Sequence, residues 1–208
     1  MIAVIDYDAG NIKSVEKAFL HIGEDVVVTR DPAALRGADR VVLPGVGSFG
    51  DAMAHIKQYH LTETIYELIR SGKPFLGICL GLQLLFPESE ESPGVAGLGV
   101  LEGKIVKIPD APGIKIPHMG WNSLDIAPES RLFKGLRDPY VYFVHSYYLK
   151  AANRQDVAAT TGYNVTIDAA VERGNLFACQ FHPEKSSDAG LQILKNFALV
   201  KKEGPYVR

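Results

Sequence analysis

The segment PFLGICLGLQL, residues 74–84, changes its hydrophobic pattern at a cysteine. The five residues before this cysteine form a short apolar run typical of a buried strand, and the residues after it read as the start of a helix. Gly77 and Gly81 flank Cys79, and glycine is favoured where a sharp turn brings backbone segments close together. The segment therefore predicts a strand that ends in a tight turn, with a thiol at the tip of the turn.

The first half of the chain repeats this alternation of strand and helix. Apolar, β-branched runs predict strands at 2–6, 25–29, 40–44 and 74–78, and apolar residues at helical spacing predict helices at 11–22, 49–59 and 61–72. Strands that alternate with helices form a parallel sheet through right-handed crossovers, with helices on both faces.

The second half is richer in strands. Its predicted strands lie at 98–108, 140–149, 156–161, 167–172 and 175–181, and a helix closes the chain at 187–201. We expect several of these strands to join the same sheet in antiparallel orientation. The loop at 87–97 is acidic and too short to separate domains. The sequence thus predicts one α/β domain over residues 1–208, with an open, mixed, mostly parallel sheet flanked by helices.

Composition narrows the range of partners. The 208 residues carry a net charge of −2, which argues against nucleic acid, because neutralising phosphates requires a basic surface. No apolar run approaches the ~20 residues needed to span a bilayer, and the N-terminus does not read as a signal peptide. Cys79 and Cys179 alone make a disulfide framework improbable, which favours a reducing cytoplasm.

The position of Cys79 suggests a nucleophile. Ligands of open α/β sheets bind at the carboxyl ends of the strands, and a helix that starts there is expected to lower the thiol pKa and to offer free N–H groups to an oxyanion. The alternative is that Cys79 merely fills the core, as most free cysteines do. Cys179 lies inside the apolar run LFACQF and is predicted to be core.

A cysteine nucleophile needs a base, and the base needs an orienting group. FHPEKS, residues 181–186, follows the last predicted strand and supplies His182 and Glu184. In an extended segment these two side chains would point the same way, so Glu184 could hold the imidazole that deprotonates Cys79. The alternative is a surface loop with an incidental histidine.

The segment LPGVGSFG, residues 43–50, contains the pattern G-x-G-x-x-G between a predicted strand and a predicted helix. This pattern is typical of dinucleotide-binding loops, but those loops require an acidic residue at the end of a second strand about 20 residues later. Glu67 falls in the middle of a predicted helix instead. A glycine-rich loop at the same edge of the sheet as Cys79 can instead turn backbone N–H groups toward an oxyanion.

PGVG, GICLGLQ and HPE, in this order and spacing, resemble the triad (class I) glutamine amidotransferases. The similarity covers essentially the whole chain and implies a flavodoxin-like fold. Finer signatures are similar to one branch of the family, whose members supply ammonia to a cyclase subunit with a (β/α)8 barrel in histidine biosynthesis. These signatures are DYDAGNIKSV (6–15), PHMGWNSL (117–124), YFVHSYY (142–148) and FHPEKSSDAGLQILKNF (181–197).

The resemblance implies a role for each matching residue. Cys79 attacks the side-chain amide of L-glutamine, His182 transfers the proton, and Glu184 orients His182. The N–H of Leu80 and one from Val46 or Gly47 form the oxyanion hole. The positions implied to hold the substrate are Gln83, Glu91, His145, Ser146 and Tyr147, with Gly47 beside them. Those implied at the cyclase contact are Asn11, Trp121, Tyr142 and Lys185. Neither metal nor cofactor is implied.

Departures from the family pattern and rival functions leave alternatives open. Pro87 stands where the family more often has an acidic residue, which puts the role of Glu91 in doubt, and Asp8 and Ala9 replace the small residues that are commoner in the N-terminal loop. His118 is expected to serve packing. The rivals are an amidotransferase for anthranilate or purine synthesis, a free-standing cysteine hydrolase, and a non-catalytic flavodoxin-like binding module.

Overall fold

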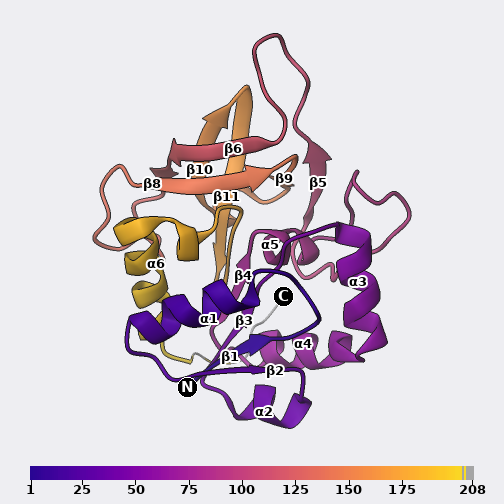
Figure 1. The fold of residues 1–208 in the computed structure, drawn as a ribbon, viewed down its shortest axis with the longest axis vertical. Coiled ribbons are helices and arrows are strands. Elements are labelled where there is room, and N and C mark those ends of the chain that lie inside the picture. Colours follow the sequence, from indigo (N-terminus) through magenta and orange to yellow (C-terminus); the bar gives the residue numbers. More distant parts are fainter. Residues whose placement is uncertain (203, 205–208) are drawn as a thin grey trace.

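The computed structural model describes residues 1–202 and 204 of the chain, and the remaining positions of the predicted domain lie outside the described residues. The main sheet has the strand order β2-β1-β3-β4-β12-β11-β10-β7, and β9 joins it through β11 and pairs with β5 (Figure 1). A second, smaller sheet pairs β6 with β8.

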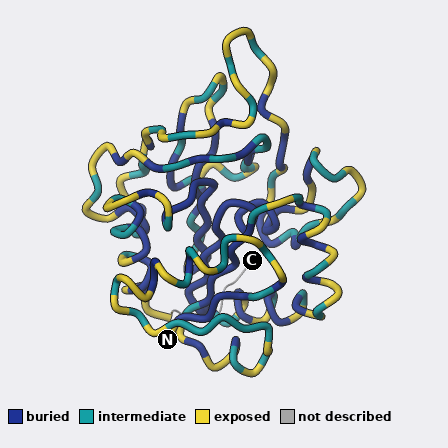
Figure 2. Tube along the Cα trace, in the orientation of Figure 1, coloured by how far each residue is buried: buried dark blue, intermediate teal, exposed yellow. Residues whose placement is uncertain are grey.

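One half of the main sheet is parallel, as predicted. Its strands are β1 (Ile2–Ile5), β2 (Val26–Thr29), β3 (Arg40–Leu43), β4 (Phe75–Ile78) and β12 (Leu176–Cys179). Every residue of β1, β4 and β12 is buried, which explains why these segments read as continuous apolar runs rather than alternating ones. The dark tube of Figure 2 follows these buried strands through the middle of the molecule.

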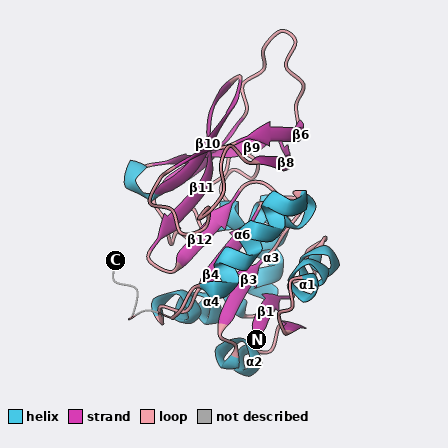
Figure 3. Cartoon of the chain, turned by 90° about the vertical axis from the view of Figure 1, so that its left-hand side faces the viewer, coloured by secondary structure: helices cyan, strands magenta, loops and turns pink. Residues whose placement is uncertain are grey.

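Helices cover both faces of this half. They are α1 (Ile12–His21), α2 (Pro32–Gly37), α3 (Phe49–Gln58), α4 (Leu61–Arg70), α5 (Leu80–Leu84) and α6 (Ser187–Leu199). Side chains of α2, α3 and α4 share one hydrophobic cluster with the sheet, and those of α1 and α6 share another. Figure 3 shows these helices packed around the strands of this half. Sequence periodicity missed α2, because six residues are too few to show a helical repeat. Asp31 caps it, accepting from the N–H groups of Ala33 and Ala34.

The other half of the main sheet is antiparallel, which confirms the expected additions. It contains β5 (Gly103–Lys107), β7 (Asp125–Ile126), β9 (Tyr147–Ala151), β10 (Val157–Tyr163) and β11 (Val165–Arg173). Short 3-10 turns follow β9 and β12, namely η1 (Arg154–Asp156) and η2 (Pro183–Lys185). No helix in the described part of the chain is long and apolar enough to cross a membrane.

The prediction of one strand over 140–149 is wrong. The chain breaks at Ser146 into β8 (Tyr140–His145) and β9, and β8 leaves the main sheet to pair with β6 (His118–Ser123). The β6–β8 pair lies above the α/β layers in Figure 1. The sequence does not predict β6, because Gly120 and Asn122 interrupt its apolar pattern.

Candidate active site

The turn after β4 has the strained geometry that the sequence predicted. Cys79 has φ 53° and ψ −106°, a conformation that L-residues rarely adopt and that surrounding structure must hold in place. A Cβ on Gly77 would lie 2.7 Å from the Gly81 carbonyl oxygen, and a Cβ on Gly81 would lie 1.9 Å from that of Leu43. Both glycines are therefore required by close backbone contacts, and the thiol lies at the tip of the turn between them.

His182 and Glu184 form the expected pair. The Nδ1 atom of His182 lies 2.7 Å from Oε1 of Glu184, and both side chains are fully shielded from solvent. Burial by itself lowers the pKa of His182, but its interactions with Cys79 and Glu184 outweigh burial and raise the pKa above that of a free imidazole. A raised pKa favours an imidazolium beside the sulfur, which is the arrangement that activates a thiol for attack.

One detail of the predicted triad needs correction. The segment after His182 is not extended, because Pro183 starts the 3-10 turn η2, and it is this turn that brings the Glu184 carboxylate to the imidazole. Cys79 has only 6% of its surface accessible, and it opens into a cavity. Cys179 is fully buried, as predicted, and burial raises the pKa of its thiol.

The cavity next to Cys79 has a volume of about 310 Å³. All residues predicted for the oxyanion hole and the substrate line it, namely Val46, Gly47, Leu80, Gln83, Glu91, His145, Ser146 and Tyr147. Pro117 and Val144 line it as well and were not predicted individually. The structure thus gathers residues from five separate segments of the chain around one thiol.

The Leu80 N–H, a predicted oxyanion donor, is already engaged. It donates to the Gly45 carbonyl at 3.3 Å, and the neighbouring Pro44 carbonyl accepts the Tyr7 hydroxyl at 2.6 Å. Gly47 has φ +105°, and a Cβ built on it meets nothing within 4 Å. In this structure the PGVG loop (residues 44–47) therefore keeps the Leu80 N–H in a hydrogen bond, so that this group is not free to bind an oxyanion. Gly47 has both the backbone freedom and the space to turn.

Glu91 lies in the loop whose path Pro87 put in doubt. Its Oε2 accepts the Phe49 N–H at 2.8 Å, so the carboxylate caps the start of α3 while it lines the cavity. Ser92 supports this arrangement by accepting the Gly50 N–H at 3.0 Å. The loop at 87–97 therefore folds against α3 and presents Glu91 at the cavity wall.

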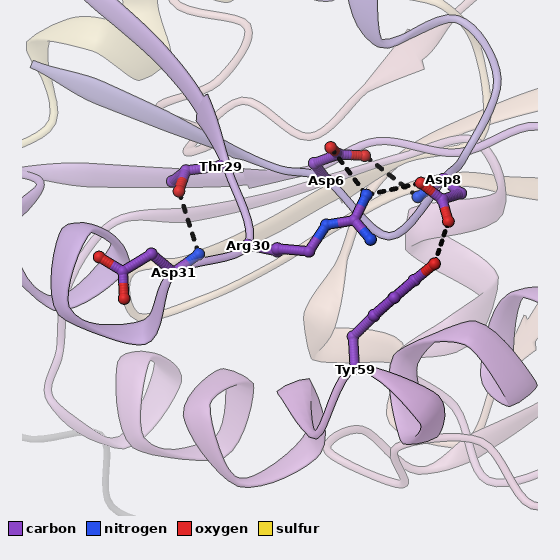
Figure 4. Close-up of polar contacts among 6 residues, drawn as sticks. All are labelled: Asp6, Asp8, Thr29, Arg30, Asp31 and Tyr59. Carbon is purple, nitrogen blue, oxygen red and sulfur yellow. Dashed lines mark hydrogen bonds and ion pairs between the residues drawn. The ribbon is translucent and has the colours of Figure 1, made fainter.

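The N-terminal loop (residues 6–11) reaches the site from the end of β1. Asn11 donates to Oε1 of Glu184 at 2.5 Å, so it contacts the triad directly and is more than a surface residue. Figure 4 shows how the loop is anchored at its middle: Arg30 pairs with Asp6 at 2.9 Å and with Asp8 at 2.5 Å, and the Tyr59 hydroxyl also bonds to Asp8.

The residues predicted at the cyclase contact lie on neighbouring elements. Trp121 of β6 and Tyr142 of β8 are paired across the small sheet, with ring centroids 6.3 Å apart, and Trp121 is 53% exposed. The Tyr142 carbonyl accepts the His182 N–H at 2.9 Å, which joins this sheet to the triad. Lys185 is exposed on η2. The structure therefore brings these positions to one rim, next to the triad.

Sequence reasoning missed two buried polar side chains near the sulfur. Tyr7 is 1% exposed, and burial together with the nearby Cys79 raises its pKa. Gln180 is fully buried, and its Nε2 lies 3.7 Å from the Cys79 sulfur. Both were detectable: Tyr7 follows β1 at the same edge of the sheet as Cys79, and Gln180 is a polar residue in an otherwise apolar strand-like run.

Comparison with known proteins decides the family. The model of the family described as "Glutamine amidotransferase class-I" matches residues 3–201. The chain belongs to this family. The amidotransferase is 55% identical to the "Imidazole glycerol phosphate synthase subunit HisH" of Methanothermobacter thermautotrophicus, over 95% of this chain and 97% of that protein. A protein of the same name from Cyanothece sp. is 53% identical, over 95% and 94% of the two chains.

Solved structures support the fold of this amidotransferase. One, described as "Crystal structure of glutamine amidotransferase", superimposes with a TM-score of 0.75 at 20% identity and covers 96% of this chain and all of that chain. A chain of PurLQS from Thermotoga maritima gives a TM-score of 0.73 at 20% identity, covering 95% and 96%. The predictions of family, fold class and an amidotransferase enzyme are thereby confirmed.

Proposed function

We propose that this chain is the glutaminase subunit of an imidazole glycerol phosphate synthase that works in the cytoplasm. It hydrolyses glutamine to glutamate and ammonia and passes the ammonia to a cyclase subunit with a (β/α)8 barrel. The cyclase then makes imidazole glycerol phosphate and aminoimidazole carboxamide ribotide for histidine biosynthesis. The observation that carries this proposal is the identity of about half of all positions, over nearly the full length, with proteins named as that subunit.

The triad supplies the chemistry of glutamine hydrolysis. The Cys79 sulfur forms a bond to the side-chain carbonyl carbon of glutamine, and the C–N bond breaks as His182 gives its proton to the departing ammonia. Water then attacks the glutamyl thioester, with His182 as the base that receives its proton, and glutamate leaves as the thiol is restored. Glu184 holds the imidazole through the 2.7 Å contact during both steps.

The cavity suits a substrate with an amide at one end and an amino acid head group at the other. Cys79 lies where the amide would bind, and Glu91 offers a carboxylate to the substrate ammonium from the cavity wall. Gln83 and the backbone of residues 145–147 provide polar groups between them. These residues position the substrate for attack, and correct placement accounts for a large part of a catalysed rate.

The contact between Leu80 and Gly45 suggests that the free subunit is held in a low-activity state. An oxyanion needs the Leu80 N–H, but this donor is bonded to the Gly45 carbonyl. Turning the peptides of the PGVG loop would free it and add a second N–H from Val46 or Gly47. Losing one such donor costs about 10²–10³ in rate, which is enough to keep the subunit nearly silent until its partner binds.

The exposed rim beside the triad is suited to hold that partner. Aromatic side chains such as Trp121 are enriched at protein interfaces, and Tyr142 lies next to it on the same sheet. Lys185 stands one residue after Glu184 and can pair with an acidic group on the barrel. A partner on this rim contacts η2, and through Asn11 it also contacts the N-terminal loop that holds the PGVG loop in place.

The decisive experiment measures glutamate release by the chain alone, with the cyclase, and with the cyclase plus its nucleotide substrate. We expect little activity from the chain alone and a rise in the complex that affects kcat far more than KM. Gly47→Pro should flatten this rise and leave assembly largely unchanged, because proline fixes φ and has no N–H to offer as the second oxyanion donor. Equal rates in all three conditions would favour a free-standing cysteine hydrolase instead.

A further inference from the structure

Gln180 is a fully buried amide that contacts both the nucleophile and Gln83, a residue of the cavity wall. It follows β12 and continues its pairing, since its N–H donates to the Ala169 carbonyl at 2.8 Å. Its side-chain Oε1 accepts Nε2 of Gln83 at 3.1 Å, and its own Nε2 lies 3.7 Å from the Cys79 sulfur. The triad chemistry described above gives this amide no role.

The direction of the Gln180 amide is fixed by a backbone carbonyl two contacts away. The Tyr147 carbonyl can only accept, so the side chain of Gln83 must turn its NH₂ toward it, at 3.1 Å. The second hydrogen of that NH₂ points to Gln180, which must then present its oxygen. The NH₂ of Gln180 is consequently left facing Cys79, and the reversed amide would set two NH₂ groups against each other.

A second set of contacts holds the Tyr147 carbonyl in place. His145 donates from Nδ1 to the same Tyr147 carbonyl at 2.9 Å, which fills the second lone pair of this oxygen. With Nδ1 protonated, Nε2 of the neutral His145 ring accepts from His118 at 3.0 Å. His118 is itself fixed between the rings of Phe143 and Tyr163, with centroids 4.8 and 3.9 Å away. The carbonyl that orders the amides is therefore rigidly held from both sides.

The other ionisable groups around the sulfur have partners of their own. The Tyr7 hydroxyl donates to Pro44, and the Cys179 thiol contacts the Phe181 carbonyl at 3.5 Å. Glu184 acts through His182, which is the cationic group beside Cys79. Among these side chains, His182 is the cationic one, but its Nε2 has no hydrogen-bond partner among the described residues, and the Gln180 amide is the side chain whose N–H group contacts the sulfur, at 3.7 Å.

We infer that Gln180 donates a hydrogen bond to the Cys79 sulfur and thereby favours the thiolate that attacks the substrate. A donor that bonds to the charged form of a group stabilises that form, so this contact strengthens the thiolate independently of His182. Gln83 acts through Gln180 as a positioning residue, because it sets which end of the Gln180 amide meets the sulfur. The inference rests on the proposed role of Cys79 as nucleophile and adds a donor to it.

The test is the pH dependence of Cys79 alkylation by iodoacetamide in the isolated chain, followed by peptide mapping. Gln180→Met keeps the volume and removes the donor. We expect the midpoint of alkylation to rise by about one pH unit, which slows alkylation at pH 7 about tenfold. Gln83→Met should shift the midpoint in the same direction by a smaller amount, since the Gln180 amide then loses its fixed direction. Gln155→Met, the same change at an exposed position on η1, is the matched control and should leave the midpoint unchanged.

An unshifted midpoint in folded Gln180→Met overturns the inference. If that variant fails to fold, an unshifted midpoint in Gln83→Met overturns it equally, because a purely structural role for the amides would not alter the ionisation of the thiol. Alkylation requires neither glutamine nor a cyclase. A chain without glutaminase activity would therefore contradict the proposed function and still leave this measurement able to decide on Gln180.

Discussion

Replacing Glu184 by glutamine separates the charge of the triad carboxylate from its shape. In the structure Oε1 of Glu184 accepts from His182 at 2.7 Å and from Asn11 at 2.5 Å, and a glutamine oxygen can accept both bonds from the same place. A hydrogen bond to an ionised acceptor contributes ~1.5–3 kcal/mol, against ~1 kcal/mol for a neutral one. For the bond from His182 the lost difference is ~0.5–2 kcal/mol, which predicts that Glu184→Gln lowers kcat/KM about 2- to 30-fold in the complex.

The same substitution predicts a shift with pH. The interactions with Cys79 and Glu184 raise the pKa of His182 against the effect of burial, so removing the negative charge lowers that pKa by about one unit. The imidazolium that protonates the leaving ammonia is then lost at lower pH, and the upper limb of the kcat/KM profile moves down by the same amount. Glu129→Gln, at an exposed position, is the control. A loss as large as that of His182→Ala, or an unmoved upper limb, would refute the orienting role.

Two further predictions concern the cysteines and the buried histidines. A glutamine-like electrophile should label Cys79 and spare the fully buried Cys179 in peptide maps, and Cys79→Ala should abolish glutamate release while ammonia-dependent synthesis by the complex continues. Loss of both activities would make Cys79 structural. Burial lowers the pKa of His118 to about 4 and, aided by nearby His118 and His182, that of His145 to about 3. Below pH ~6.5 the unfolded chain therefore binds protons that the folded chain does not. Urea melts should show that the free energy of unfolding falls by about 1.4 kcal/mol for each imidazole with every unit by which the pH is lowered. A free energy of unfolding that stays constant down to pH ~4.5 would contradict this.

The turn at Cys79 was predictable because its close backbone contacts leave room only for glycine at two fixed positions. Gly77 and Gly81 are needed wherever β4, α5 and β3 approach this closely, so their spacing around Cys79 identifies the turn without any structure. His182 and Glu184 were found as residues, although the reason given for their meeting was wrong, because proline starts a turn there and the extended backbone ends at His182.

What the sequence did not reveal depends on contacts between distant segments. Gln180 sits inside an apolar run, and its significance depends on a partner 97 positions away. The bond from Leu80 to Gly45 depends on the conformation of a glycine-rich loop, and a sequence motif does not specify that conformation. β6 was missed because Gly120 and Asn122 interrupt its apolar pattern, and β8 was predicted only as part of one longer strand, because the break at Ser146 depends on pairing with β6.

The anchoring of the N-terminal loop has a consequence for how this chain can change over generations. Tyr7 bonds to Pro44, Asp8 belongs to the cluster of Figure 4, and Asn11 bonds to Glu184, so three attachments fall within five consecutive positions. One inserted residue displaces everything beyond it by up to about 3.8 Å, more than the length of any of these bonds. Insertions and deletions should therefore be rejected here even where substitutions are accepted, whereas the exposed connection between β5 and β6 is free to lengthen.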